Sequence, residues 1–388
     1  MELLGWILIA RQLGPSSFAV LSIGFLVARW GGLLADWGAA QRGARDVAAR
    51  DHDAVAALVR TRLAITLTLV PIYLAGVYVS GHRELWPLVA VIVAGGLIRD
   101  WVALGEGHRV AASAPSLVRG LLFLAIAVSL SGRGALALGV GLAYALSALA
   151  SLAYTPLPAG PPEGTGRPAS DIDPRITARR ARYAAPWAVV LVLAAQVYTT
   201  LDTILLEALR PSGEAGIYFA LYRIPLAIAT VVGLAVSGLV PPLTADLRSG
   251  ELALADARRS LARVGLVAGG MVLLLIPLLV AVGPMAFGPA YQSGRTALAL
   301  VLVATAMATA GAPLGALWLA VGGERQLALL VVGGAVVNVA ANVMLIPRFG
   351  MSGAGAVTVL SEGIVLFGTW RLTAAPTPQP SVLAGGTA

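Results

Sequence analysis

The sequence predicts an all-α polytopic membrane protein, with about twelve transmembrane helices arranged as two pseudo-symmetric six-helix bundles. Three observations predict this class. Hydrophobic residues make up 58% and charged residues 12% of the 388 residues, whereas soluble domains average about 25% charged residues. Long uncharged stretches recur along the whole chain, and about 18 apolar residues are enough to cross the hydrocarbon core. The two halves of the chain also share a common pattern.

Apolar windows place the predicted spans in two sets of six. The first set covers residues 1–10, 16–39, 62–80, 85–104, 114–131 and 134–155. The second set covers residues 184–208, 214–243, 264–286, 295–321, 326–346 and 352–371. The first span is short, because a helix needs about 20 residues to cross the bilayer. We interpret it as a truncated helix from a start codon assigned too late, and a re-entrant segment is the alternative.

The stretch between the two sets is rich in proline, glycine and charge, which is the composition of a solvated linker. The predicted parts are an N-terminal bundle at 1–155, a cytoplasmic linker at 156–183, a C-terminal bundle at 184–372 and a flexible cytoplasmic tail at 373–388. The segments LGPSSFAVLSIGF, from Leu13, and LRPSGEAGIYFAL, from Leu209, align. Both lie in the outer loop after the first helix of their half, which indicates a parallel repeat about an axis along the membrane normal.

The arginines near helix ends predict the orientation, because cytoplasmic loops of membrane proteins are enriched in basic residues. With the spans above, seventeen arginines, Arg60 and Arg62 among them, fall on one side and six on the other. Both termini and the linker are therefore predicted to be cytoplasmic, in a multi-pass protein of the inner (cytoplasmic) membrane. The arginines are scattered through short loops and form no single basic stripe, so we expect no nucleic-acid partner.

Four stretches resemble the oligosaccharide and polysaccharide flippases of the multidrug/oligosaccharidyl-lipid/polysaccharide (MOP) exporter superfamily. They are LGPSSFAVLSIGF, EAGIYFALYRIP, FGPAYQSGRTALALVLVATA and GGERQLALLVVGGAVVNVAANVMLIPRFGMSGAGAVTVLSEG. The resemblance extends over nearly the whole chain, and it implies two six-helix bundles around a cavity that opens alternately to each side. It also implies that the substrate is an oligosaccharide on a polyprenyl diphosphate, with a polymerase or glycosyltransferases of the same pathway as partners. The family usually has a full first helix, which this chain lacks.

Ionisable side chains inside a span cost about 2.5 to 3.5 kcal/mol to insert, so they tend to face the bundle interior and to have a role or a partner. A guanidinium group offers a planar, bidentate donor for phosphate oxygens. We therefore predict that Arg29, Arg99 and Arg223 bind the diphosphate. The alternative is that they form structural ion pairs, Arg29 with Asp36 and Arg223 with Asp202.

Three carboxylates and two tyrosines complete the predicted site. Asp36, Asp202 and Glu362 are predicted to bind a coupling proton or sodium ion, and structural pairing or capping is the alternative. Tyr218 and Tyr222 are predicted to stack on sugar rings, unless they belong to the aromatic belt at the membrane interface.

Three other polar residues in or near spans are predicted to be structural. Arg119, at the start of its helix, is expected at the cytoplasmic surface. Asn338 and Asn342 lie four residues apart on one helix face, where amide groups commonly form hydrogen bonds between helices.

Motifs of the main enzyme classes are absent from the sequence. There is no cysteine, no Walker A motif, and no histidine with metal-ligand spacing. We therefore expect no cofactor, no metal and no enzymatic activity. A cation-coupled multidrug exporter of the same superfamily remains an alternative and would favour carboxylates in the cavity. A membrane polysaccharide polymerase or glycosyltransferase is another, and it would be expected to have a large soluble loop.

Overall fold

A computed structural model describes the chain except residues 1, 49, 107, 156–173, 211–212, 322 and 375–388. The helices of the first part are α1 (Glu2–Asp36), α2 (Ala39–Ala48), α3 (His52–Val79), η1 (Arg83–Leu88), α4 (Val89–Leu97), α5 (Asp100–Gly105), α6 (Arg109–Ser129) and α7 (Arg133–Tyr154). They are followed by α8 (Pro174–Leu209), α9 (Glu214–Ser249), α10 (Leu254–Phe287), η2 (Pro289–Gly294), α11 (Arg295–Ala320) and α12 (Glu324–Ala374). No strand occurs among the described residues, and the predicted all-α class is confirmed.

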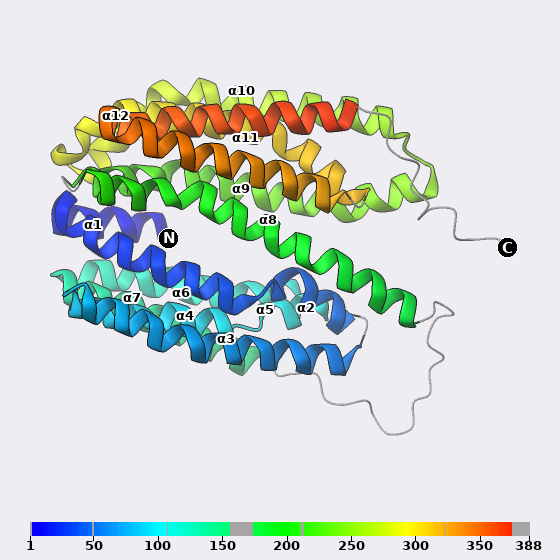
Figure 1. Cartoon of the computed structure of the whole chain (residues 1–388), viewed down its shortest axis with the longest axis horizontal. Helices are drawn as coiled ribbons and strands as arrows, with labels where there is room; N and C mark the ends of the chain where they lie inside the picture. The colour runs from blue at the N-terminus through cyan, green and yellow to red at the C-terminus, as the bar shows by residue number, and fades with distance from the viewer. Residues whose placement is uncertain are drawn as a thin grey trace. The chain divides into compact units, whose positions relative to one another are not determined.

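Helices α1 and α12 are each two helices joined by a single glycine. Gly14 (φ 69°, ψ 168°) and Gly350 (φ 55°, ψ −139°) have backbone angles that side chains disfavour. In α1, the rings of Trp6 and Phe25 are 5.0 Å apart, whereas 19 residues of straight helix would separate them by about 28 Å. The chain therefore reverses at each glycine, and α1 and α12 are helical hairpins, which run out and back in Figure 1.

The number of helices agrees with the sequence prediction. Nine helical stretches of the described chain are long and apolar enough to cross a membrane. Counting two helices in each hairpin and adding the 36-residue α8 gives the twelve predicted helices. The segment before Gly14 is the short one, as expected, and its Trp6 packs against Phe18, Phe25 and Phe123. These four rings are buried, and their packing anchors the short segment to the rest of the unit.

Several helices extend beyond their predicted spans at the arginine-rich end. Helix α3 begins at His52, α8 at Pro174 and α10 at Leu254, each ahead of the predicted apolar span, and α9 continues to Ser249. Residues 174–183 of the predicted linker are thus helical, while residues 156–173 and the tail from 375 lie outside the described residues. A hydropathy window predicts only the apolar part of a helix, so it does not include polar helix ends that extend beyond the membrane.

One predicted span is not a single helix. The sequence predicts a continuous helix at 85–104, but α4 ends at Leu97 and α5 begins at Asp100. Between them, Ile98 (ψ 132°) is extended and Arg99 (φ −120°, ψ 27°) is not helical. We call this interruption the α4–α5 break.

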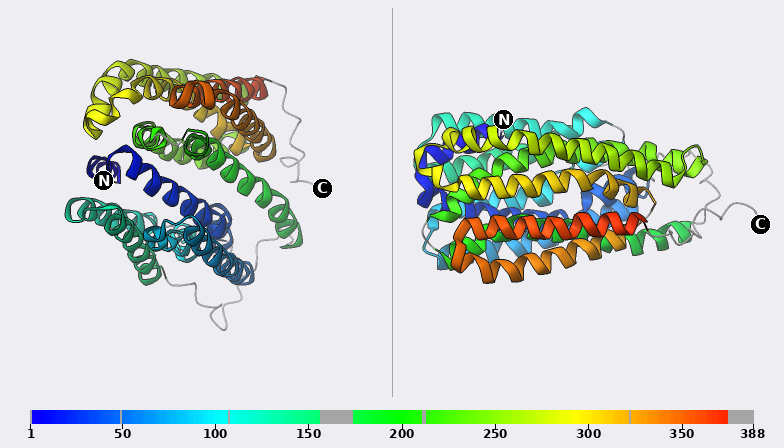
Figure 2. Two further views of the ribbon diagram at one scale, coloured as in Figure 1. Left: turned by 60° about the vertical axis from the view of Figure 1, so that its left-hand side comes forward. Right: turned by 90° about the horizontal axis from the view of Figure 1, so that it is seen from above.

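The chain divides into two compact units, Met1–Leu193 and Ala194–Ala388, with the boundary inside α8. In the first unit, α1 packs against α3, α4, α6 and α7, and α4 also packs against α7. In the second unit, α11 is central and packs against α9, α10 and α12. Within each unit the long helices lie side by side in up-and-down order (Figure 2).

Candidate functional site

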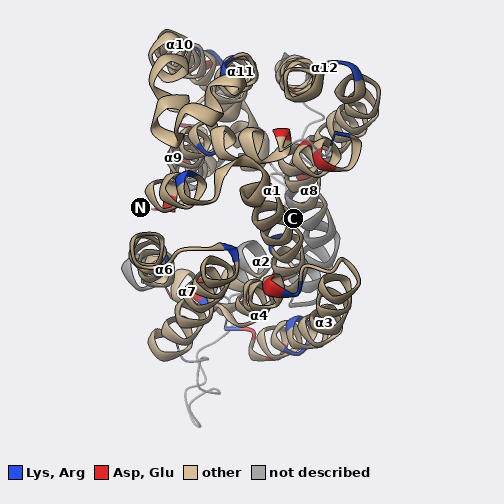
Figure 3. Ribbon diagram, turned by 90° about the vertical axis from the view of Figure 1, so that its left-hand side faces the viewer, with Lys and Arg blue, Asp and Glu red and all other residues tan. Residues whose placement is uncertain are grey.

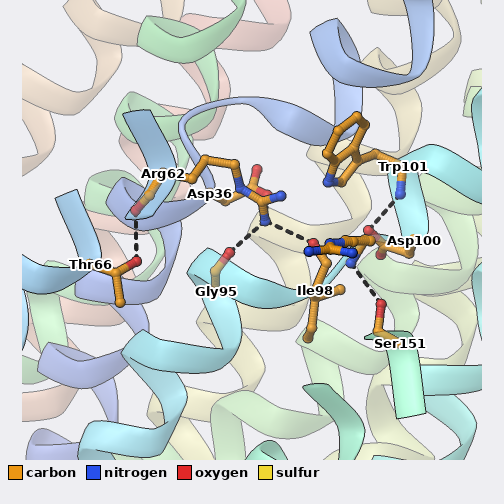
Figure 4. A network of polar contacts seen from close by, with 9 residues as sticks. Asp36, Arg62, Thr66, Gly95, Ile98, Asp100, Trp101 and Ser151 are labelled. Atoms are coloured by element: carbon orange, nitrogen blue, oxygen red, sulfur yellow. Dashed lines mark hydrogen bonds and ion pairs between the residues drawn. The ribbon is translucent and has the colours of Figure 1, made fainter. Parts of the chain in front are cut away.

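Charged positions are sparse along the helices of either unit (Figure 3). In the first unit the most deeply buried of them is Arg62 on α3, with a side chain only 2% exposed. Its Nη2 donates to the carbonyl oxygens of Gly95 and Ile98, at 2.7 and 2.8 Å, and lies 3.2 Å from Oδ1 of Asp36 (Figure 4). Its guanidinium also lies over the ring of Trp101, at 5.6 Å. Arg62 thus links α1, α3, α4 and α5.

Two glycines bring α1 and α4 close enough for this arrangement. A Cβ placed on Gly95 would lie 2.2 Å from the carbonyl oxygen of Gly32, so neither helix could approach as closely with a side chain there. Small residues permit this kind of close helix crossing in membranes. Because Asp36 lies four residues after Gly32, about one turn further along α1, the crossing sets its carboxylate beside Arg62.

Arg62 was not predicted to be a site residue, because it was counted among the arginines near helix ends on the cytoplasmic side. The structure places it inside α3, where the buried residues are Val55, Leu58, Arg62, Thr66, Tyr73 and Val77. Their spacing of three, four and seven residues defines one helix face. The sequence could have indicated that Arg62 is buried, because it lies on the apolar stripe of its helix.

The predicted diphosphate ligands Arg29 and Arg99 are both half-buried in the first unit. Arg29 lies on α1, seven residues before Asp36, and Arg99 lies in the α4–α5 break. Neither guanidinium group has a hydrogen-bond or ion-pair partner among the residues that the structure describes. Among the described residues Arg29 does not form the alternative ion pair with Asp36, and Asp36 pairs with Arg62 instead.

Arg119 was expected at the cytoplasmic surface, but it lies midway along α6. Its Nε donates to Oε1 of Glu2 at 2.8 Å, and its guanidinium lies 5.0 Å from the centre of the Tyr144 ring. Its side chain is 18% exposed. Arg119 therefore joins α6 to α1 and α7, which is the structural role that buried ion pairs commonly have.

In the second unit, the predicted residues Asp202 and Tyr218 are in direct contact. Asp202 of α8 is 1% exposed, and its Oδ2 accepts a 2.6 Å hydrogen bond from the Tyr218 hydroxyl of α9. Its Oδ1 accepts from the backbone N–H of Thr203 at 2.7 Å. The Tyr218 hydroxyl also lies near Thr358 of α12.

The two halves of the α12 hairpin carry the rest of this cluster except Tyr198, which lies on α8. Nδ2 of Asn338 donates to Oγ of Ser361 at 3.0 Å, and Nδ2 of Asn342 donates to Oδ1 of Asn338 at 2.9 Å. Both asparagines are fully buried, so the predicted hydrogen bonding between helices is confirmed. Glu362 follows Ser361, and its carboxyl group lies close to the hydroxyl of Tyr198. We call Asp202, Tyr218, Tyr198, Asn338, Asn342, Thr358, Ser361 and Glu362 the C-terminal polar cluster.

The carboxylates of the C-terminal polar cluster differ from Asp36 in one respect. Within the described part of the chain, neither Asp202 nor Glu362 forms an ion pair with a basic residue. A buried carboxylate without a basic partner is strongly disfavoured in its ionised form, unless a cation accompanies it. The cluster therefore has the chemistry to take up a proton or a small cation.

The remaining predicted residues lie on α9. The ring of Tyr222, half-buried, is 5.7 Å from that of Tyr218. The guanidinium of Arg223 lies 4.0 Å from the ring centre of Phe219. Among the described residues, no group of three or more histidine, cysteine, aspartate or glutamate side chains is arranged to hold a metal ion.

No protein-family model and no curated protein matches the sequence. Comparison with solved structures establishes the fold: this is a multi-pass membrane protein with the fold of the MOP superfamily transporters, as predicted. A multidrug resistance transporter of the MATE family, in its inward-facing conformation, is similar with a TM-score of 0.69 and 14% identity over 100% of this chain and 95% of that chain.

Two other similar structures have different roles. The lipid II flippase MurJ, in an inward closed conformation, has a TM-score of 0.65 and 10% identity, covering 96% of this chain and 85% of that chain. A MOP superfamily transporter from Pyrococcus furiosus, described as having a binding pocket of reverse polarity that suggests a different function, has a TM-score of 0.58 and 14% identity over 96% of this chain and 90% of that chain. The fold is therefore shared by multidrug transporters and a lipid flippase.

Proposed function

We propose that the protein is a flippase that moves a polyprenyl-diphosphate-linked oligosaccharide across the cytoplasmic membrane, for cell-surface polysaccharide biosynthesis. One observation carries the proposal: Arg29 and Arg99 are half-buried in membrane-spanning segments of the first unit and have no partner for their guanidinium groups among the described residues. An unpaired cation at membrane depth is costly and marks a functional site. A diphosphate supplies two anionic groups that match the planar donors of arginine.

The C-terminal polar cluster supports an ion-coupled mechanism for this transport. We propose that Asp202 and Glu362 take up the coupling proton or sodium ion, because no basic residue of the described chain neutralises them. Asp36 was the third predicted coupling residue. Its charge is already balanced by Arg62, so in this proposal it stabilises the first unit instead.

The proposal includes two further roles. In the second unit, Arg223 remains a predicted ligand of the diphosphate, and Tyr222 offers a half-exposed ring for stacking on a sugar. Both termini and residues 156–183 lie on the cytoplasmic side, which the arginine distribution supports. A polymerase or glycosyltransferases of the same pathway would supply and consume the lipid-linked sugar.

A cation-coupled multidrug exporter is the second candidate function. It is favoured by the carboxylates of the C-terminal polar cluster, buried Asp202 and half-buried Glu362, and by its buried tyrosines, since an organic cation would be attracted to unpaired carboxylates. The two candidates differ in the sign of the substrate charge. A flippase needs Arg29 and Arg99 for an anion, whereas an exporter of cationic drugs would be helped by their removal.

Transport in proteoliposomes tests both candidates. The first probe is a fluorescent polyprenyl-diphosphate disaccharide, whose arrival in the opposite leaflet is measured by access of a membrane-impermeant quencher. The second probe is ethidium. We expect the protein to move the first probe, and Arg29→Gln and Arg99→Gln each to slow the movement by at least about tenfold.

The matched control is Arg60→Gln, which removes an arginine that is exposed on α3. This control should transport the diphosphate probe at the rate of the unsubstituted protein. Movement of ethidium without movement of the diphosphate probe would favour the exporter. Full diphosphate transport by both arginine variants would overturn the assignment of the site.

A further inference from the structure

The α4–α5 break distinguishes the first unit from the second. Each unit contains a 3-10 turn that leads directly into a helix: η1 into α4, and η2 into α11. Helix α11 runs without interruption for 26 residues. Helix α4 ends after nine residues, at Leu97. The interruption is therefore specific to the first unit and does not follow from the shared pattern of the two halves.

The backbone groups freed by the break are satisfied by side chains from other helices. Arg62 of α3 donates to the carbonyl oxygens of Gly95 and Ile98, at 2.7 and 2.8 Å. Ser151 of α7 accepts a hydrogen bond from the N–H of Arg99 at 2.6 Å. Interrupted helices persist at membrane depth only where such partners exist. The break is thus a fixed feature of the unit, surrounded by the polar contacts drawn in Figure 4.

Arg62 is itself fixed from three sides. Asp36 of α1 forms its ion pair, the ring of Trp101 lies against its guanidinium, and Asp100 is close enough to attract it. A Cβ on Gly43 of α2 would lie 2.4 Å from the Trp101 ring, so α2 presses the ring into place. A side chain held this tightly transmits its position to the backbone that it binds.

Arg99 lies in the α4–α5 break, which determines where its side chain begins. It is half-buried and its guanidinium is unpaired within the described chain, while its backbone N–H is fixed by Ser151 and the preceding carbonyl by Arg62. If α4 continued as a regular helix through residue 99, the Arg99 side chain would leave from a different point and in a different direction.

We propose that Arg62 is a positioning residue: by holding the α4–α5 break through its bonds to Gly95 and Ile98, it sets Arg99 for the diphosphate of the substrate. This role rests on the proposed flippase function. Arg62 itself does not contact the substrate and affects transport only through the position of Arg99.

The first arm of the test measures the break itself, without transport. Because the chain has no cysteine, spin labels can be attached at Trp86→Cys and Leu104→Cys alone, two exposed positions on η1 and α5. Pulsed electron resonance then gives their distance distribution in the full-length protein. Arg62→Met should broaden or shift this distribution, Arg62→Lys should do so less, and Arg60→Met should leave it unchanged. An unchanged distribution in Arg62→Met overturns the inference, whatever the protein transports.

The second arm uses the polyprenyl-diphosphate disaccharide probe in proteoliposomes. Arg99→Gln removes a bidentate charge-assisted contact and should lower kcat/KM by about 10- to 150-fold. Arg62→Met should lower it by about 10- to 100-fold through misplacement of Arg99, mainly by raising KM. Arg62→Lys, which keeps the positive charge, should recover part of the loss.

The double variant Arg62→Met/Arg99→Gln decides whether the two residues act together. Its kcat/KM should fall no lower than that of Arg99→Gln, because Arg62 acts through Arg99. Multiplied losses in the double variant would overturn the inference. Absence of any diphosphate transport by the unsubstituted protein would instead contradict the proposed function, and it is distinguishable because the distance measurement does not depend on transport.

Discussion

Replacing aspartate by asparagine can be compared at two sites, Asp36 with a basic partner and Asp202 without one. The carboxylate of Asp36 is 3.2 Å from the guanidinium of Arg62, whereas Asp202 has no basic partner among the described residues. Replacement by asparagine removes one negative charge at either position and changes the side-chain shape little. We expect Asp36→Asn and Asp202→Asn to affect the free energy of unfolding differently.

Asp36→Asn should destabilise the protein, because it removes the ion-pair partner of the Arg62 guanidinium, which is only 2% exposed. Removing one partner of a buried ion pair costs about 3–5 kcal/mol. The Asp36 side chain is 28% exposed, and Arg62 keeps two carbonyl acceptors. The loss should therefore lie near the lower limit, at about 3 kcal/mol.

Asp202→Asn keeps an oxygen for the Tyr218 hydroxyl and loses the acceptor of the Thr203 N–H. That single hydrogen bond contributes about 1 kcal/mol. The substitution also removes a carboxylate whose burial without a counter-charge is unfavourable. In buffer without sodium at neutral pH, the free energy of unfolding should fall by no more than about 1 kcal/mol or should rise.

Equilibrium unfolding in mixed detergent micelles, followed by tryptophan fluorescence, measures both effects. Added NaCl, compared with choline chloride at equal ionic strength, should stabilise the unsubstituted protein by about 1.4 kcal/mol for each tenfold increase above the dissociation constant, if sodium is the coupling ion. Asp202→Asn should abolish this gain and Asp36→Asn should retain it. A loss of stability in Asp202→Asn as large as that in Asp36→Asn would refute the reasoning.

Three other predictions concern the site and the hairpin turns. Arg29→Ala, Arg99→Ala and Arg223→Ala should each abolish complementation of a flippase-deficient strain at normal membrane abundance; full activity in all three would contradict diphosphate binding. Tyr218→Phe removes the donor to Asp202 and should lower stability by about 1.5–3 kcal/mol, measured by the same unfolding assay, if the carboxylate is ionised, and by less if it is protonated. Gly350→Ala should lower stability by at least about 1–3 kcal/mol, because a Cβ there would collide with the carboxylate of Glu214; an unchanged unfolding midpoint would show that the turn can relax.

Much of the fold could be predicted because hydrophobicity reports it directly. Each apolar run of bilayer length except 85–104 lies in one helix, to within a few residues at its ends, although several helices continue past the run at the arginine-rich end. The hairpin turns at Gly14 and Gly350 were approximated as short loops, since a hydropathy window does not resolve a one-residue turn. The α4–α5 break was missed because residues 85–104 are apolar on average in spite of Arg99 and Asp100, so a hydropathy window runs across them. The contacts from Arg62 and Ser151 that satisfy the break come from other helices, and the sequence does not show them.

The site could be predicted only in part, because a sequence shows which residues are ionisable but not which of them are paired. Arg29 and Arg62 are both arginines in or beside an apolar run of the sequence. Arg62 has a carboxylate partner, whereas Arg29 has none among the described residues. The pairing of Asp36 with Arg62 depends on the close crossing of α1 and α4 at Gly32 and Gly95. The sequence spacing favoured Arg29 as the partner of Asp36 instead, because these two residues lie seven apart on one face of α1.

The glycine turns within α1 and α12 limit how these helices can move. With a single residue between them, the two arms of a hairpin have no slack for sliding lengthwise, and the aromatic contacts of Trp6 and the bond from Asn338 to Ser361 fasten one arm to the other. In the proposed transport cycle, both arms of a hairpin would therefore move together, and bending would have to occur at other points of the chain.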